Sequence, residues 1–181
     1  DGKTIYAQAR GGRINGQWQR YSVTLKTAGG VKPTAAARLV IATESPGTVW
    51  FNQVSLFPPT YKDRPNGNRA DLMQKLVDMK PAFLRFPGGN YLEGETVATR
   101  FKWKETLGAL DQRPGHRGTW GYRSSDGMGL LEFLEWCEDM KAEPVLAVFA
   151  GYALHGETIP GGPALQPFVQ EALDEIEYVT G

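Results

Sequence analysis

The sequence predicts a chain with two differently folded parts, an antiparallel β segment over residues 1–59 and an α/β segment over residues 60–181. In the first part, apolar residues recur at every second position, which is the pattern of half-buried strands. This pattern ends at Pro58 and Pro59, which cannot continue a strand ladder. Beyond them, amphipathic helical patterns alternate with short apolar runs, as in parallel strands joined by crossover helices.

Four strands are expected before Pro58, with no helix between them, and such an arrangement is typical of an antiparallel β-sandwich. They cover residues 4–10, 18–26, 37–43 and 48–57.

The α/β part is expected to contain three helices and two buried strands. Asn68 is a candidate N-cap of the first helix, whose inner face would carry Leu72, Leu76 and Met79; Ser125 or Asp126 would cap the second helix. Two strands correspond to about a quarter of a (β/α)8 barrel, which needs eight. The expected helices are 68–80, 125–141 and 167–179, and the expected strands are 82–86 and 144–150.

Composition excludes several classes of protein. Hydrophobic residues make up 41% and charged residues 22%, which is typical of a globular chain. Twenty basic and twenty acidic residues give a net charge of zero without any block of like charge, so neither nucleic acid nor an anionic membrane is an expected partner. No apolar run is long enough to span a bilayer. The single Cys137 lies on an apolar helix face and is expected in the core.

The strongest local candidate for a binding site is the segment from Arg85 to Asn90, where a strand ends in an arginine followed by Gly88 and Gly89. Sites of parallel α/β folds lie at the carboxyl ends of strands. Arg85 offers a planar fork for a carboxylate, the glycines let backbone approach a ligand, and the Asn90 amide suits a sugar hydroxyl. The structural alternative is an ion pair for Arg85 and a left-handed turn position for Asn90.

No metal or cofactor is expected. His116 and His155 are 39 residues apart, and there is no serine nucleophile elbow, phosphate-binding loop or dinucleotide fingerprint. Glycoside hydrolysis needs two carboxyl groups about 5 to 9.5 Å apart. The available carboxylates form no specific motif; Glu93 and Glu95 are expected to be solvated, Asp126 to cap a helix, and Glu157 to lie in the loop after the second strand.

Aromatic residues are frequent in the two long loops that follow the strands. Aromatic planes stack on the apolar faces of sugars, so these side chains would line a carbohydrate cleft if the loops share one face. Taken singly, each of these aromatic residues is more often a packing residue than a binding residue. They are Tyr91, Trp103, Trp120, Tyr122 and Tyr152.

The order and spacing of several short motifs resemble the α-L-arabinofuranosidases of glycoside hydrolase family 51. This resemblance covers residues 60–181, and residues 1–59 resemble the last strands of a carbohydrate-binding jelly roll found in some members. The motifs are Phe83 to Asn90, Tyr91-Leu92-Glu93-Gly94, Trp103-Lys104-Glu105-Thr106-Leu107-Gly108, Arg113-Pro114-Gly115-His116, Trp120-Gly121-Tyr122 and Ser125-Asp126-Gly127.

The resemblance implies a partial (β/α)8 (TIM) barrel preceded by part of a β-sandwich. It implies that Asn90 holds arabinofuranose hydroxyls, that Arg85 orients a catalytic carboxylate and that Trp120 lies near the sugar, with Gly88 and Gly89 in the same substrate-binding turn. The family uses a retaining mechanism with two glutamates. Both are expected beyond Gly181, so no catalytic residue is assigned and the 181-residue chain alone is expected to be an inactive fragment.

The favoured function is therefore that of part of an enzyme that removes arabinofuranosyl groups from arabinoxylan- or arabinan-type glycans. One alternative is a non-catalytic carbohydrate-binding module with Trp18 and Trp50 as platforms. Another is a subunit that completes its fold as a homo-oligomer or with a partner chain. Secretion is favoured because plant cell walls are extracellular, with a cytoplasmic location as the alternative.

Overall fold

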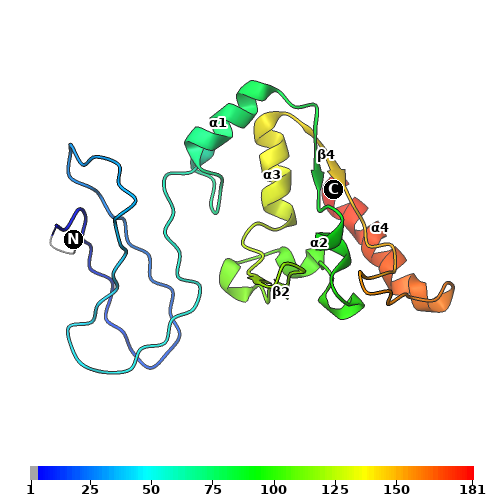
Figure 1. Cartoon of the computed structure of the whole chain (residues 1–181), viewed down its shortest axis with the longest axis horizontal. Helices are drawn as coiled ribbons and strands as arrows, with labels where there is room; N and C mark the ends of the chain where they lie inside the picture. The colour runs from blue at the N-terminus through cyan, green and yellow to red at the C-terminus, as the bar shows by residue number, and fades with distance from the viewer. Residues whose placement is uncertain (1–3) are drawn as a thin grey trace. The chain divides into compact units, whose positions relative to one another are not determined.

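The computed structural model describes residues 4–181, and the chain forms two compact units, one ending at Val49 and the other covering Trp50–Gly181. Regular secondary structure lies in the second unit (Figure 1). Among the described residues, no helix is long and apolar enough to cross a membrane.

Residues 4–59 differ from the expectation. They form extended, looping backbone without a helix or strand (Figure 1), and no backbone–backbone hydrogen bond is found among them. Their apolar side chains are exposed, for example Ile5 at 73%, Trp18 at 74% and Val40 at 76%. The four strands predicted here are thus not formed, because alternation alone cannot form a sheet without a hydrogen-bonded neighbour and a second layer.

The central feature of the second unit is a parallel strand pair. β1 (Phe83–Phe86) pairs with β4 (Glu143–Leu146) in a register that places Phe83 opposite Glu143 and Phe86 opposite Leu146. α3 (Leu130–Met140) lies between them in the chain and packs on both strands. The predicted parallel strands and crossover helix are confirmed.

α3 begins later than expected. Neither Ser125 nor Asp126 caps it; Gly129 is the N-cap residue and its N–H donates to the Glu132 carboxylate at 2.8 Å. The Leu130 N–H donates to the Thr106 hydroxyl at 3.0 Å. The helix therefore starts on contacts supplied by its own first turn and by the preceding loop. Cys137, expected in the core, is buried, and so are Leu130 and Met140 on the same helix, whereas Leu131 is 41% exposed.

α1 (Ala70–Met79) and α4 (Gln166–Thr180) flank this unit. The inner face expected for α1 is correct only for Leu76, which packs against the core. Leu72 and Met79 are 50% and 72% exposed, and Met73, at 1%, is the buried residue of this helix. The helix is rotated about its axis so that Met73, and not Leu72, faces the core. Apolar residues at neighbouring positions allow either orientation, because both share the 3.6-residue repeat of a helix. Asn68 is not its cap; Arg69 precedes the helix and makes no capping bond.

Two apolar clusters form the core. The first joins Phe86 on β1 with the start of α3, and Phe133 stacks on Phe86 with ring centroids 3.5 Å apart. The second joins α1 with the end of α3 through Met73 and Met140. The buried members are Phe86, Phe101, Trp103 and Leu130 in the first cluster, and Met73, Met140 and Ala142 in the second.

The long loop between β1 and α3 is ordered by short elements. α2 (Asn90–Glu93) follows the glycine turn, and β2 (His116–Arg117) and β3 (Arg123–Ser124) form a small antiparallel hairpin. Single-turn 3-10 helices fill much of the rest of the loops; in the whole described chain these are Tyr61–Asp63, Val97–Thr99, Trp103–Thr106, Leu110–Gln112 and Pro163–Leu165.

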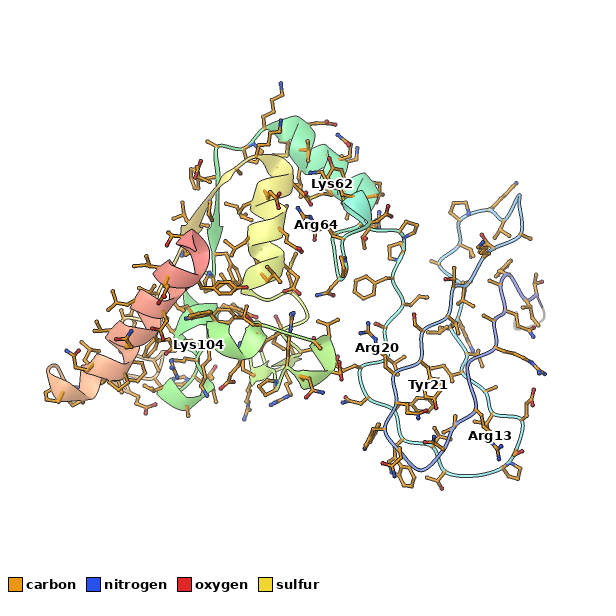
Figure 2. All side chains as sticks on the ribbon, turned by 180° about the vertical axis from the view of Figure 1, so that it is seen from behind. Arg13, Arg20, Tyr21, Lys62, Arg64 and Lys104 are labelled. Carbon is orange, nitrogen blue, oxygen red and sulfur yellow. The ribbon has the colours of Figure 1, made fainter. Side chains whose placement is uncertain are left out.

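The segment before α1 is tied to α3 by charge. Asp139, whose side chain is 5% exposed, accepts from the Lys62 ammonium at 2.8 Å and from Arg64 Nε at 2.9 Å. Both cations lie next to α3 in Figure 2. Burial raises the pKa of Asp139, but the hydrogen bonds from Arg64 and Lys62 outweigh it, so its pKa lies below the ordinary value. Asp139 is therefore an anion that anchors this segment at neutral pH.

Candidate functional site

The parallel pair brings two loops to one edge. Because β1 and β4 run in the same direction, their carboxyl ends meet, and the loops after them come into contact. The Leu154 N–H donates to the Gly94 carbonyl at 3.1 Å, and the Tyr152 hydroxyl donates to the Glu93 carboxylate at 2.9 Å. The condition set for a shared cleft, that both loops lie on one face, is met.

The glycine turn after β1 combines close approach with unusual backbone. A Cβ on Gly88 would lie 3.1 Å from Arg85 Nη2, so the guanidinium lies directly on this glycine. Gly89 has a φ of 48° and a ψ of −127°, a conformation that L side chains rarely adopt. The left-handed position of this turn is thus Gly89, and Asn90 is the first residue of α2.

Asn90 and Arg85 are both exposed and available. Neither side chain makes a hydrogen bond or ion pair with any residue of the described chain, so the structural alternatives weighed for them do not apply. The N–H donors of Arg85 and the amide donor and acceptor of Asn90 are therefore open to a ligand.

An open cleft of about 450 Å³ lies next to this turn. Its size suits a small organic ligand. Of the predicted site residues, Gly88 lines it directly. Trp120 is 57% exposed and stacks on the lining residue Tyr122 with ring centroids 6.5 Å apart and planes at 20°. The lining residues are Phe86, Pro87, Gly88, Tyr91, Tyr122, Ser124, Ser125, Gly127, Met128 and Phe133.

Two of the lining residues, Tyr91 and Ser124, belong to a buried polar network that the sequence did not indicate. Asp126 is 4% exposed and accepts from the Ser124 hydroxyl at 2.8 Å and the Tyr91 hydroxyl at 3.2 Å, and its Oδ2 lies 3.0 Å from His116 Nδ1. The predicted cap role of Asp126 is therefore wrong. Its only sequence signal is the Ser-x-Asp spacing, which is common in turns.

The ionisation of this network follows from its contacts. Burial raises the pKa of Asp126, but hydrogen bonds from His116, Ser124 and Tyr91 outweigh burial and hold that pKa below its ordinary value. Burial raises the pKa of Tyr91 to about 12. Near neutral pH the network thus combines a carboxylate with an un-ionised phenol that donates to it.

The other carboxylates weighed for chemistry serve as loop contacts. Glu157 accepts from the Val97 N–H at 2.8 Å, Glu95 pairs with His155, and Glu93 accepts from Tyr152. These contacts link the loops after β1 and β4, and none of the three carboxylates lines the cleft. Within residues 4–181, no group of three or more histidine, cysteine, aspartate or glutamate side chains is placed to bind a metal ion.

The remaining aromatic candidates have different surroundings. Trp103 is 6% exposed and its indole N–H donates to the Glu171 carbonyl at 3.1 Å, so it is a core residue. Trp18 and Trp50 are each 74% exposed. Tyr91 and Tyr122 line the cleft as expected, while Met128 and Phe133 were not anticipated there.

Comparisons with known proteins point to one family. Residues 75–181 match the family model described as "Alpha-L-arabinofuranosidase 1 domain". The chain is 54% identical over 133 residues to the probable alpha-L-arabinofuranosidase A of Aspergillus terreus, covering 72% of this chain and 21% of that protein. It is 45% identical over 147 residues to alpha-L-arabinofuranosidase 2 of Arabidopsis thaliana, covering 80% of this chain and 21% of that protein.

Solved structures agree. The arabinose-bound α-L-arabinofuranosidase MgGH51 superposes with a TM-score of 0.65 at 53% identity, covering 68% of this chain and 20% of that one. The arabinose complex of the Thermotoga maritima α-L-arabinofuranosidase gives a TM-score of 0.50 at 27% identity, covering 68% of this chain and 22% of that one. This chain spans about a fifth of the length of the relatives that it matches. It belongs to the α-L-arabinofuranosidases of glycoside hydrolase family 51.

Proposed function

We propose that this chain supplies part of the arabinofuranose-binding cleft of a retaining arabinofuranosidase that acts on arabinoxylan- or arabinan-type glycans. The observation that carries the proposal is the open cleft at the carboxyl end of β1, which is lined by Gly88 and Tyr122. Trp120 stacks on Tyr122, and the Asn90 amide, two residues beyond Gly88, has no partner in the described chain. Amide groups bind sugar hydroxyls in both hydrogen-bond directions, and aromatic planes cover the apolar sugar face.

Each assigned residue has a role in this proposal. Asn90 would hydrogen-bond a sugar hydroxyl, Arg85 would orient a catalytic carboxylate, and Trp120 would cover the sugar. Gly88 and Gly89 leave room for the ligand at the backbone. No carboxylate lines the cleft, so the chain contributes binding groups and neither catalytic glutamate.

The domain assignment is part of the same proposal. β1 and β4 would be neighbouring strands of a (β/α)8 barrel within residues 60–181, and residues 1–59 would belong to a β-sandwich module. The exposed apolar residues Val169, Leu173 and Ile176 on α4 support the barrel, because the outer helices of a barrel pack against neighbouring helices. Sedimentation tests whether copies of the 181-residue chain cover this face instead; a monodisperse monomer speaks against self-assembly.

The binding role is tested by titrating the 181-residue chain with L-arabinose and following backbone amide shifts by NMR. We expect saturable shifts around the glycine turn, and Asn90→Ala should weaken binding about 2- to 10-fold because one neutral hydrogen bond contributes about 0.5–1.5 kcal/mol. Asn52→Ala, in an exposed part of the chain, is the matched control. Absence of saturable shifts, or equal affinity of Asn90→Ala and wild type, would contradict the proposal.

The expected lack of catalysis is tested separately. The purified chain is incubated with a chromogenic aryl α-L-arabinofuranoside, and no release above background is expected. Turnover by the chain would show that one of its own carboxylates, such as Glu93 or Glu157, performs chemistry.

A further inference from the structure

The hairpin that carries the aromatic wall of the cleft is too small to hold its own position. β2 and β3 have two residues each, with His116 opposite Ser124 and Arg117 opposite Arg123. A two-stranded hairpin is marginal in water even when it is longer. Side-chain contacts to the rest of the protein must therefore decide where Trp120 and Tyr122, at its tip, are placed.

One carboxylate contacts both strands of this hairpin. Asp126 lies 3.0 Å from His116 Nδ1 on β2 and accepts from the Ser124 hydroxyl on β3 at 2.8 Å. It also accepts from the Tyr91 hydroxyl at 3.2 Å, which joins the hairpin to the segment that follows the glycine turn. Both strands of the hairpin and the segment after the glycine turn thus share a single anion.

Asp126 is itself fixed to the core. Its carbonyl accepts from Arg113 Nη1 at 2.8 Å, and Arg113 is held by Glu132 in the first turn of α3. Its N–H donates to Ser124 Oγ at 3.1 Å, and its φ of 50° gives the backbone a sharp turn at this point. The position of the carboxylate is therefore set by α3, one of the rigid elements of the unit.

We propose that Asp126 is the positioning residue of the cleft: it holds Tyr122, on which Trp120 stacks, at a fixed distance from Tyr91 and Gly88. Tyr122, Ser124, Tyr91 and Gly88 all line the cleft, whereas Asp126 does not. Asp126 thus acts through the groups that it holds and does not contact the ligand. Only the consequence for sugar binding rests on the proposed function.

The groups that face this carboxylate define what each variant removes. They are the His116 imidazole from β2, the Ser124 hydroxyl from β3 and the Tyr91 phenol from α2, with the Arg113 guanidinium bonded to the same residue's carbonyl. Asp126→Ala removes all contacts of the carboxylate. Asp126→Asn keeps an acceptor for Ser124 and Tyr91, and Tyr91→Phe removes a single O–H while the ring stays in the core.

The test uses the 181-residue chain and needs no sugar. The five tryptophan indole N–H resonances are recorded by NMR, and Trp120 is assigned with Trp120→Phe. In Asp126→Ala we expect the Trp120 indole to shift or broaden and to become more accessible to acrylamide, while Trp103 and Trp136 stay unchanged. Asp126→Asn should restore much of the wild-type signal. Asp78→Ala, in an exposed carboxylate on α1, is the control and should move none of them.

Two results would overturn the inference: an unchanged Trp120 signal in folded Asp126→Ala, or equal changes at all five indoles, which would indicate a merely structural role. If Asp126→Ala does not fold, Tyr91→Phe decides by the same signal, with a smaller expected shift confined to Trp120. Arabinose titration of these variants is read separately, with about 5-fold weaker binding expected for Asp126→Ala. If the wild-type chain does not bind arabinose, the proposed function is refuted. The Trp120 indole signal still tests the positioning role of Asp126 in that case.

Discussion

The guanidinium of Arg113 and the carboxylate of Glu132 form a buried bidentate ion pair, with Nη2 to Oε1 at 2.6 Å and Nη1 to Oε2 at 3.1 Å. Their side chains are 2% and 8% exposed. Arg113 also donates to the Gly108 carbonyl at 2.8 Å. Through this pair, the loop that carries the hairpin is joined to the first turn of α3.

Breaking this pair is expected to be costly. Arg113→Ala should lower the free energy of unfolding by about 3–5 kcal/mol, because Glu132 would remain buried without its partner. The measurement is urea unfolding followed by tryptophan fluorescence. Arg69→Ala is the matched control, since its ion pair with Asp71 is exposed, and it should cost less than about 1 kcal/mol. Similar small effects of both substitutions would contradict the importance of the buried pair.

Gly129 is required by a close contact and not by its backbone angles. A Cβ at this position would lie 2.3 Å from the Thr106 carbonyl oxygen and 2.7 Å from Thr106 Cβ. Gly129→Ala would push apart the start of α3 and the loop, weakening the bond from the Leu130 N–H to Thr106. We expect a loss of about 2 kcal/mol or more in urea unfolding.

The control for this substitution is Gly161→Ala, because a Cβ on Gly161 would meet nothing within 4 Å. Its effect should stay within about 0.5 kcal/mol. A cost at Gly129 as small as that at Gly161 would show that the loop moves aside without penalty.

The anchor at Asp139 predicts a dependence of stability on acid. Its pKa is lowered in the folded state, so its contribution is present above the unfolded pKa of about 3.9 and is lost as the pH falls through the folded pKa. Asp139→Asn should therefore reduce the unfolding free energy at pH 7, and the difference from wild type should shrink below about pH 4. Urea unfolding at pH 7, 4 and 3 measures this. A difference that stays constant with pH would exclude the ion pairs with Lys62 and Arg64 as its source.

The elements that the sequence predicted well are those whose patterns depend on neighbours within the same element. The apolar stripe of α3 and the short apolar runs of β1 and β4 fall within a few residues of the predicted bounds. Helix ends were less predictable, since the actual start of α3 depends on Thr106, which is distant in sequence. Strand formation in residues 4–59 requires partners that alternation does not specify.

The candidate site also contains residues that the sequence could predict and residues that it could not. Arg85, Gly88 and Asn90 could be predicted from the sequence because they lie at or just after the end of a predicted strand. The structure places them at the carboxyl end of β1. The network of Asp126, His116 and Tyr91 joins residues up to 35 positions apart. No local pattern marks such a contact, because it arises from the path of the long loop.

α4 contains a buried charged residue. Glu175 is 4% exposed, whereas the apolar residues Leu173 and Ile176 on the same helix are 53% and 60% exposed. One oxygen of the Glu175 carboxyl, Oε1, has no hydrogen-bond partner among the described residues. Burial, and then the nearby charge of Glu171, raises the pKa of Glu175 to about 7 against an ordinary value of 4.5. The carboxyl is thus protonated in the folded protein at pH values where it is ionised in the unfolded chain.

The sign of the pH effect follows from proton binding. Between pH 4.5 and 7 the folded state holds a proton that the unfolded state has released, so this group makes the protein less stable as the pH rises. Above pH 7 the penalty levels off at about 3 kcal/mol, since each unit of pKa shift corresponds to about 1.4 kcal/mol. Glu175→Gln keeps the shape of the side chain without its charge. Its free energy of unfolding should be close to that of wild type at pH 4.5 and higher than that of wild type at pH 8.

Urea unfolding at both pH values measures this difference, with the exposed Glu177→Gln on the same helix as control. Parallel pH profiles for wild type and Glu175→Gln would show that the carboxyl reaches solvent and that α4 packs less closely on Phe101 and Trp103 than the structure indicates.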